Sequence, residues 1–312
     1  MKNQKLRSLV VWAAVLVVCI LLNFVLPGTA VSIYTKALIM VLFALSLNIQ
    51  IGYAGMMPLG HSTLLGVGAY VYTLMVRANC NMLLSAVAAV AASAVMGVII
   101  GFLCLRGKNG MTFAFLSMGI ATLVYTIAIQ SNFLGRDVGL SGAKRPSFAS
   151  TTVAFGVMVT VLVLLCVFVL YQLLHSPFAR TITALRENQE RLAFLGVDTY
   201  RLQLVTFVIS SVFAGAAGVL YAMFNSGAYP TFLNTSMATQ GMMMCLIGGM
   251  NTFYGPILGA AIVTTIITEV SNLTTYWQTV LGVIIIACVL FFRGGILGSR
   301  PTGKRKGGEA HE

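Results

Sequence analysis

A charge-free run decides the fold: TTVAFGVMVTVLVLLCVFVLYQLL, residues 151–174. A helix of about 20 apolar residues spans the hydrocarbon core of a bilayer, so this run predicts a membrane crossing. Comparable apolar runs lie on both sides of it, at 8–27, 31–51, 62–77, 82–105, 111–131, 201–224, 236–250, 256–270 and 276–292. The spacing predicts an all-α, polytopic transmembrane helical bundle of about 8–10 helices.

The composition excludes a large soluble part. Hydrophobic residues make up 58% of the 312 residues and charged residues 8%, whereas soluble domains carry about 25% charged residues. We expect one transmembrane domain over 1–299 and a charged cytoplasmic tail over 300–312. The six cysteines are scattered, without a C-x-x-C pair or a neighbouring histidine. Neither a disulfide framework nor a metal site is therefore expected.

The distribution of Lys and Arg predicts the orientation. If all ten runs cross, 14 of the 19 Lys and Arg residues fall at the N-terminus, in 106–110, in 175–201 and in the C-terminal tail, while four fall in the alternate loops. Cytoplasmic loops carry such an excess of positive charge, so no nucleic-acid partner is needed to explain it. Both termini (N-in and C-in) and 175–200 are expected in the cytoplasm, and 132–150 is expected outside.

Glycine and proline interrupt the chain at one place in each half. GYAGMMPLGH, residues 52–61, precedes the short run 62–77, and GGMNTFYGP, residues 248–256, separates the runs 236–250 and 256–270. At about 1.5 Å per residue these three runs are too short for plain crossings, so we expect broken or re-entrant segments.

Irregular backbone at membrane depth survives where protein or a water-filled path satisfies it, which makes both interruptions candidates for a translocation path. The candidate path residues are Gly52, Tyr53, Gly55, Pro58, His61, Gly249, Gly255 and Pro256. Two alternatives stay open: glycine-mediated helix packing for the interruptions, and a backbone carbonyl as the partner of His61.

The segment 175–200 predicts a short amphipathic helix outside the membrane, over 177–195. Ser176 suits its N-cap, Pro177 its first position and Gly196 its left-handed C-terminal cap. An apolar face is expected from Ile182, Leu185, Gln189, Leu192 and Leu195, and i,i+4 ion pairs from Arg186 with Glu190 and Glu187 with Arg191. The mixed charges favour a protein partner over the alternative, a helix lying in the membrane interface.

Three rival chemistries find little support. Ion-driven carriers need ionisable groups within the membrane. Apart from the terminal residues Arg77 and Arg201, only Lys36 and Glu269 lie in the apolar runs, both near their ends. The nearest approach to a P-loop, over 298–305, has Arg305 where a Ser or Thr would hold magnesium. A G-x-S-G sequence over 139–142 resembles that of intramembrane serine proteases, but no histidine is expected on the same side of the membrane as Ser141. A passive channel remains open, because the glycine-rich segments could supply backbone carbonyls.

The chain resembles permeases of the branched-chain amino acid ABC importer family. The resemblance is carried by the segments 52–70, 176–202, 205–221, 247–259 and 291–298, and it extends from about residue 36 to 298. Importers of this kind carry a Glu-Ala-Ala-x-x-x-Gly pattern in the loop that docks on the ATPase. Glu190 and Gly196 keep that spacing, whereas Arg191 and Leu192 stand where the pattern has alanines.

The resemblance implies a permease subunit without enzyme activity or cofactor of its own, in a bacterial cytoplasmic (inner) membrane. Its expected partners are two ATP-binding subunits, a second related permease subunit, an extracytoplasmic substrate-binding protein and membrane lipid. The ATPase-coupling residues are expected to be Arg186, Glu187, Asn188, Glu190 and Gly196. Branched-chain amino acids are the implied substrate, with urea or another small polar solute as the alternative.

Overall fold

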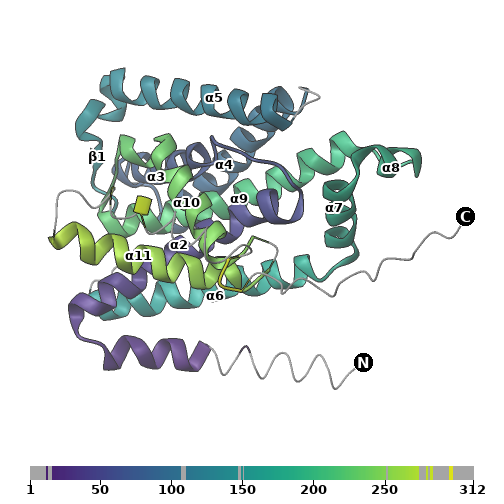
Figure 1. The fold of residues 1–312 in the computed structure, drawn as a ribbon. Coiled ribbons are helices and arrows are strands. Elements are labelled where there is room, and N and C mark those ends of the chain that lie inside the picture. The colour runs from purple at the N-terminus through teal and green to yellow at the C-terminus, as the bar shows by residue number, and fades with distance from the viewer. Residues whose placement is uncertain are drawn as a thin grey trace, which may run out of the picture.

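The structure is a computed structural model that describes residues 12, 16–106, 110–146, 149, 151–250, 252–273, 279, 282–283 and 295–297. Figure 1 shows a bundle of helices, which confirms the predicted fold class. Six of the described helices are long and apolar enough to cross a membrane. They are α2 with its π-helical extension η1 (Gly28–Asn48 and Ile49–Tyr53), α4 (Met82–Cys104), α5 (Gly110–Gln130), α6 (Thr152–Leu174), α9 (Thr199–Asn225) and α11 (Gly255–Leu273).

Shorter elements complete the described chain. They are an apolar helix over Leu16–Val25, α3 (Ser62–Arg77), α7 (Pro177–Glu187), α8 (Gln189–Phe194), α10 (Thr235–Gly248), the 3-10 turns η2 (Asn132–Leu134), η3 (Arg136–Val138) and η5 (Pro230–Phe232), and the strands β1 (Leu140–Ser141) and β2 (Gly227–Ala228). The strands pair antiparallel, with Leu140 opposite Ala228 and Ser141 opposite Gly227. In Figure 1, α7 and α8 stand at one end of the bundle and β1 at the other; we call these the α7 end and the β1 end.

The predicted helix lengths need one correction. The short runs 62–77 and 236–250 correspond to α3, with 16 residues, and α10, with 14. The run 256–270 belongs to α11, whose 19 residues can span a membrane, so the prediction of a short segment was wrong there. The helix continues through the polar residues Thr268 and Ser271, whose hydroxyls donate to the carbonyls of Thr264 and Thr268. The run 276–292 and the tail 300–312 lie almost entirely outside the described residues, as does the start of the run 8–27.

The helices repeat one pattern twice. A long buried helix, a reversal of the chain, a half-length helix and another long helix follow each other in α2, α3 and α4, and again in α9, α10 and α11. Residues 54–56 line one cavity together with residues 199–203, so α2 ends where α9 begins. The two triplets therefore run in opposite directions, which is the arrangement of an inverted repeat. Each half-length helix also contacts the long helix of the other triplet, α3 on α9 and α10 on α2.

The half-length helices start near each other in the centre of the bundle. The Ser62 hydroxyl, in the first turn of α3, donates to the carbonyl of Leu233 just before α10, over 3.2 Å. From there α3 runs towards the β1 end, where the Tyr72 hydroxyl donates to the Lys144 carbonyl, and α10 runs towards the α7 end. The first sequence interruption thus precedes the start of α3 within the bundle, whereas the second follows the end of α10.

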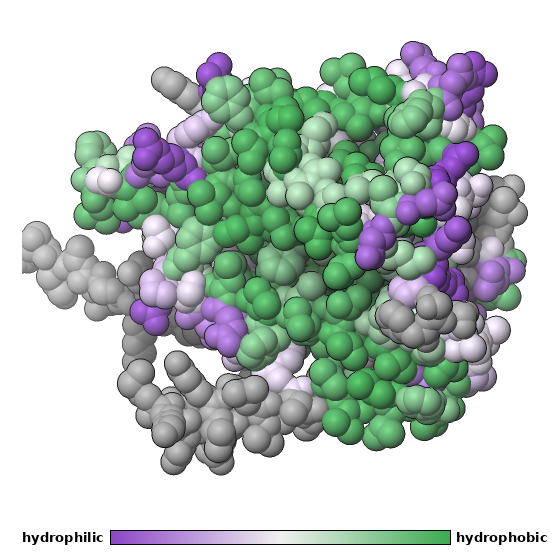
Figure 2. All heavy atoms as spheres, turned by 180° about the vertical axis from the view of Figure 1, so that it is seen from behind, coloured by the Kyte–Doolittle hydropathy of each residue, from purple (hydrophilic) through white to green (hydrophobic). Residues whose placement is uncertain are grey.

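Apolar side chains cover most of the visible face of the bundle, and hydrophilic ones gather towards its two ends (Figure 2). Large apolar residues of α4, α5 and α6 are exposed, among them Leu83, Phe115 and Leu165. This distribution is that of a protein surrounded by lipid.

Candidate coupling site

The amphipathic segment consists of two helices, which corrects the prediction of one helix over 177–195. Asn188 lies between α7 and α8 with φ −160° and ψ 103°, and its side-chain oxygen accepts a hydrogen bond from the Arg191 amide over 2.9 Å. Asparagine favours helix N-caps because its side chain replaces the missing backbone acceptor. The pairs Arg186 with Glu190 and Glu187 with Arg191 consequently span a helix break and do not share one helical face. The asparagine itself was the signal in the sequence that could have revealed this break.

The apolar face of this segment is partly as predicted. Ala179, Ile182, Leu185 and Leu192 are buried. The prediction was wrong for Gln189 and Leu195, which are exposed, because the break at Asn188 turns α8 outward. Leu195 is 80% exposed, and Phe194 beside it is 90% exposed. Two neighbouring apolar side chains therefore project from the bundle beyond the membrane-spanning helices.

The predicted ends of the segment are confirmed by position. Ser176 precedes α7 and Pro177 opens it, although the Ser176 hydroxyl donates back to the carbonyl of Leu173 instead of capping α7. Gly196 follows α8 with φ +83°. The amides of Gly196 and Val197 donate to the carbonyls of Ala193 and Leu192, which is the paired bonding of a glycine-terminated helix.

Arg186 connects α7 to the first interruption. Its Nη1 donates to the carbonyl oxygen of Gly52 over 2.6 Å, across 134 residues of sequence. Gly55 has φ +71°, and a Cβ built there would lie 2.8 Å from Cγ of Arg186. One side chain of the loop therefore bonds the end of η1 and packs closely against the irregular backbone that follows it. Arg186 and Gly52 were predicted as members of two separate groups of residues; the structure brings them together.

The second interruption lies against the first. Asn48 Nδ2 donates to the Thr252 carbonyl over 3.2 Å, and a Cβ at Gly52 would collide with the carbonyl oxygen of Met250. Gly249 has φ +114°, and the Gly255 amide at the start of α11 donates to the Thr252 hydroxyl. The prediction of irregular backbone is confirmed in both halves.

The candidate path residues divide into two groups. Six lie at the α7 end, within the two interruptions or in the first turn of α11: Gly52, Tyr53, Gly55, Gly249, Gly255 and Pro256. Pro58 and His61 are buried in the bundle further along the chain. His61 is fully buried and its Nε2 lies 2.9 Å from the Ser46 hydroxyl. A serine hydroxyl, and not the carbonyl considered from the sequence, is thus its partner on that nitrogen.

A cavity of about 710 Å³ lies between the loop and the membrane-spanning helices. Gly55, Arg186, Glu187, Asn188 and Glu190 line it, together with Phe113 of α5 and Tyr200 and Gln203 of α9. Four of the five predicted coupling residues thus share one space with the first interruption. Within the described ranges, no group of three His, Cys, Asp or Glu could hold a metal ion.

Arg186 links the loop to both interruptions. Its side chain bonds the Gly52 carbonyl, and Gly52 lies against Met250 in the segment between α10 and α11. The half-length helices α3 and α10 therefore each adjoin a segment that is linked to this loop.

Two known proteins are similar to this chain over nearly its whole length, and a third is similar over a smaller part. High-affinity branched-chain amino acid transport system permease proteins LivM of Salmonella typhimurium and Escherichia coli are each 26% identical, over 95% of this chain and 77% of the relative. An autoinducer 2 import system permease protein LsrC of Photorhabdus laumondii is 28% identical over 39% of each chain. None of the solved structures matches the chain significantly.

A family model described as the branched-chain amino acid transport system permease component matches residues 29–290, which span α2 to α11 and both interruptions. The chain belongs to this family of membrane permease components.

Proposed function

We propose that the chain is the permease subunit of an ABC importer, forming the translocation path for branched-chain amino acids and coupling it to a separate ATPase. The hydrogen bond from Arg186 to Gly52 carries the proposal, because it joins an exposed loop to broken helices inside the membrane. A passive channel has no need of such a link. In the proposed complex, two ATP-binding subunits act on the loop, a second related permease completes the path, and an extracytoplasmic binding protein delivers the solute.

The proposed ATPase dock consists of α8 and its cap. Phe194 and Leu195 are the apolar part of this surface, and Glu190 is the charged part. Apolar anchors within a polar rim are typical of protein interfaces. Gly196 fixes the direction in which the two apolar side chains project, since it closes α8 with left-handed backbone.

The substrate is proposed from the relatives and from the chemistry of the path. The LivM proteins are named for branched-chain amino acid transport and match most of the chain, whereas the LsrC protein is named for autoinducer 2 import and matches a smaller part. None of the candidate path residues is acidic or basic, apart from the buried imidazole of His61. A zwitterion with an apolar side chain suits this composition; urea or another small polar solute is the alternative.

The assembled complex tests the proposal. The chain should be purified with its partner permease, ATPase subunits and binding protein, reconstituted in proteoliposomes, and assayed for uptake of leucine, urea and autoinducer 2. We expect ATP-dependent leucine uptake that requires the binding protein. Uptake of leucine without the ATPase would support a channel and contradict the proposal. ATP-dependent uptake of urea alone would contradict the proposed substrate and identify urea in its place.

The dock is tested separately with Phe194→Asp and Leu195→Asp. Each should reduce the amount of ATPase that copurifies with the permease, because a charge in an apolar contact is costly. Phe133→Asp is the matched control, since Phe133 is 73% exposed in η2, near the β1 end. Equal loss of ATPase in all three variants would contradict docking on α8.

In the proposed orientation, the α7 end lies on the cytoplasmic side of a bacterial inner membrane. In a cysteine-free background, Thr183→Cys on α7 and Asp137→Cys in η3 expose one thiol at each end. An impermeant thiol reagent added to intact cells should label Asp137→Cys and leave Thr183→Cys unlabelled. The reverse pattern would invert the orientation. Ser147, in the same predicted outer loop, lies outside the described residues.

A further inference from the structure

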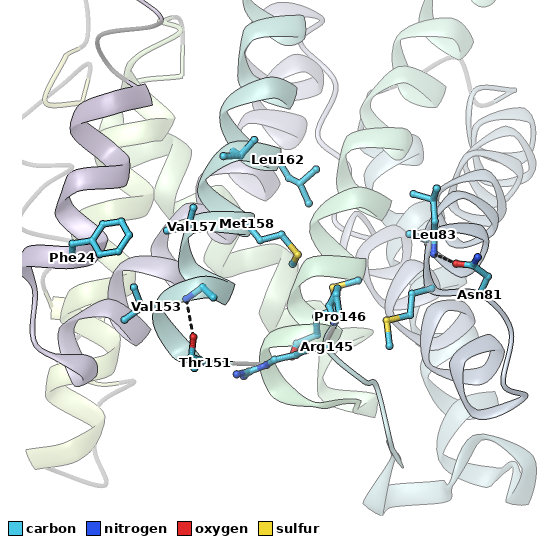
Figure 3. A pocket seen from close by; sticks show the side chains of 15 residues that line it. Phe24, Asn81, Leu83, Arg145, Pro146, Thr151, Val153, Val157, Met158 and Leu162 are labelled. Atoms are coloured by element: carbon cyan, nitrogen blue, oxygen red, sulfur yellow. Dashed lines mark hydrogen bonds between the residues drawn. The ribbon is translucent and has the colours of Figure 1, made fainter. Parts of the chain in front are cut away.

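A large apolar groove lies at the β1 end, away from the coupling site. Its volume is about 1210 Å³, and its walls come from the starts of α4 and α6, with Phe24 and Met223 beside them (Figure 3). The coupling function described above uses none of these residues. The groove is therefore a separate candidate binding site.

The wall contributed by α6 consists of two apolar stripes. Val153, Val157 and Val161 form one, and Ala154, Met158 and Leu162 form the other, each with a spacing of four residues. Residues four apart lie on one helical face, and eight residues of helix extend about 12 Å. Leu83 and Ala86 of α4 also line the groove. It is thus a long apolar trough that follows the helices into the membrane.

One cationic group stands at the mouth of this trough. Arg145 Nε donates to the Met223 carbonyl over 3.1 Å, and its Nη2 donates to the Phe224 carbonyl over 3.0 Å. The guanidinium carbon also lies 4.4 Å from the centroid of the Phe155 ring. These contacts fix the positive charge in place. A guanidinium has five N–H donors, so donors remain for a further acceptor.

Two helix N-termini add to the positive potential there. Asn81 caps α4 and Thr151 caps α6, with their side-chain oxygens accepting from the amides of Leu83 and Ala154, and both caps line the groove. Helix N-termini carry a partial positive charge. None of the 15 lining residues is acidic. Charge complementarity at the mouth therefore calls for an anion.

The mouth of the trough lies at the ends of three membrane-spanning helices. The crossings α4 and α6 begin there and α9 ends there, so Arg145 lies where apolar sequence gives way to polar sequence. This is the level of lipid headgroups. We propose that the groove binds an anionic phospholipid, with its phosphate against Arg145 and an acyl chain along the stripes of α6.

The full-length protein, purified in detergent, tests this site by native mass spectrometry with phosphatidylglycerol and phosphatidylethanolamine of identical acyl chains. We expect about tenfold preferential retention of phosphatidylglycerol, because its headgroup has a net negative charge whereas the ammonium group of phosphatidylethanolamine offsets its phosphate. Arg145→Gln should abolish the preference and Arg145→Lys should keep part of it. Ala154→Trp should displace lipid of both kinds, because the indole would fill the groove.

The matched control is Arg77→Gln, which removes an exposed cation near the same end of the bundle but outside the groove. It should leave lipid retention unchanged. Equal retention of the two lipids by the unaltered protein, or an equal loss in Arg77→Gln and Arg145→Gln, would overturn the proposal. A cross-link from Ala154→Cys to the partner permease in the assembled complex would also overturn it, since the groove would then be a subunit interface.

Discussion

Two reversals of the chain occupy equivalent places in the inverted repeat, and they are held in different ways. Residues 54–61 connect α2 to α3, and residues 226–234 connect α9 to α10. The first lies beside the 710 Å³ cavity, and its Gly55 lies against Arg186 of the loop. The second contains β2, which pairs with β1, and Arg145 bonds two carbonyls of the preceding helix.

The difference indicates on which end the loop would act in the proposed function. A strand pair and two carbonyl bonds restrain the β1 end, whereas the reversal at the α7 end has irregular backbone next to open space. Of the two reversals, the first is the one that Arg186 of α7 contacts, at Gly55. We infer that movement of α7 displaces the first reversal while the second stays fixed, which would switch access from one side.

Valine at the two interruptions of the α7 end should have the largest effect. Gly55 has positive φ and contacts Arg186, and a Cβ at Gly255 would lie 2.5 Å from Thr252 Oγ1 and 2.8 Å from the Gly248 carbonyl. Side chains forced into such contacts cost about 1–3 kcal/mol. Gly55→Val and Gly255→Val should each lower solute uptake in proteoliposomes about tenfold or more.

The control for these variants is Ala91→Val, on an exposed position of α4. It should leave uptake within about twofold of the unaltered protein, since substitutions at such positions change stability little. A comparable loss in all three variants would show that the interruptions have no special role.

Removing the Arg186 link should have the next largest effect. Hydrogen bonds to charged groups contribute about 1.5–3 kcal/mol, so Arg186→Gln should lower uptake about fivefold or more while substrate-stimulated ATP hydrolysis persists. Arg180→Gln removes an exposed cation from the same helix and should change neither rate. If Arg186→Gln instead releases the ATPase subunits, Arg186 belongs to the dock and the link does not transmit movement.

A substitution in the second reversal, residues 226–234, should lower the stability of the protein without changing the coupling of uptake to ATP hydrolysis. A Cβ at Gly227 would lie 2.6 Å from the Leu140 carbonyl across the strand pair. Gly227→Val should lower the free energy of unfolding by about 1–3 kcal/mol, measured by thermal denaturation, with uptake per ATP hydrolysed unchanged. Gly119→Val is the control, because a Cβ at Gly119 meets nothing within 4 Å. A fall in uptake per ATP in Gly227→Val would show that this end moves as well.

The long helices were predictable from the sequence, whereas the contacts between residues far apart in the chain were not. The apolar runs 82–105, 151–174 and 201–224 match α4, α6 and α9 within two residues at each end, because a helix in lipid must satisfy its own backbone. The bond of Arg186 to Gly52 joins residues 134 apart, and no local pattern encodes such a contact. The strand pair was also missed, because strands of two residues are too short to show an alternation of apolar and polar residues.

The smallest effect is expected at Gly196, where only backbone conformation is at stake. Its φ of +83° disfavours side chains, yet a Cβ there would meet nothing within 4 Å, so the cost is conformational strain of about 1–2 kcal/mol. Gly196→Val should loosen the cap, change the direction of Phe194 and Leu195, and lower ATPase copurification a few-fold. Gly196→Asn should do less, because asparagine tolerates left-handed backbone. Equal losses in both variants would mean that the ATPase contacts the glycine surface itself and that the cap geometry is not what it needs.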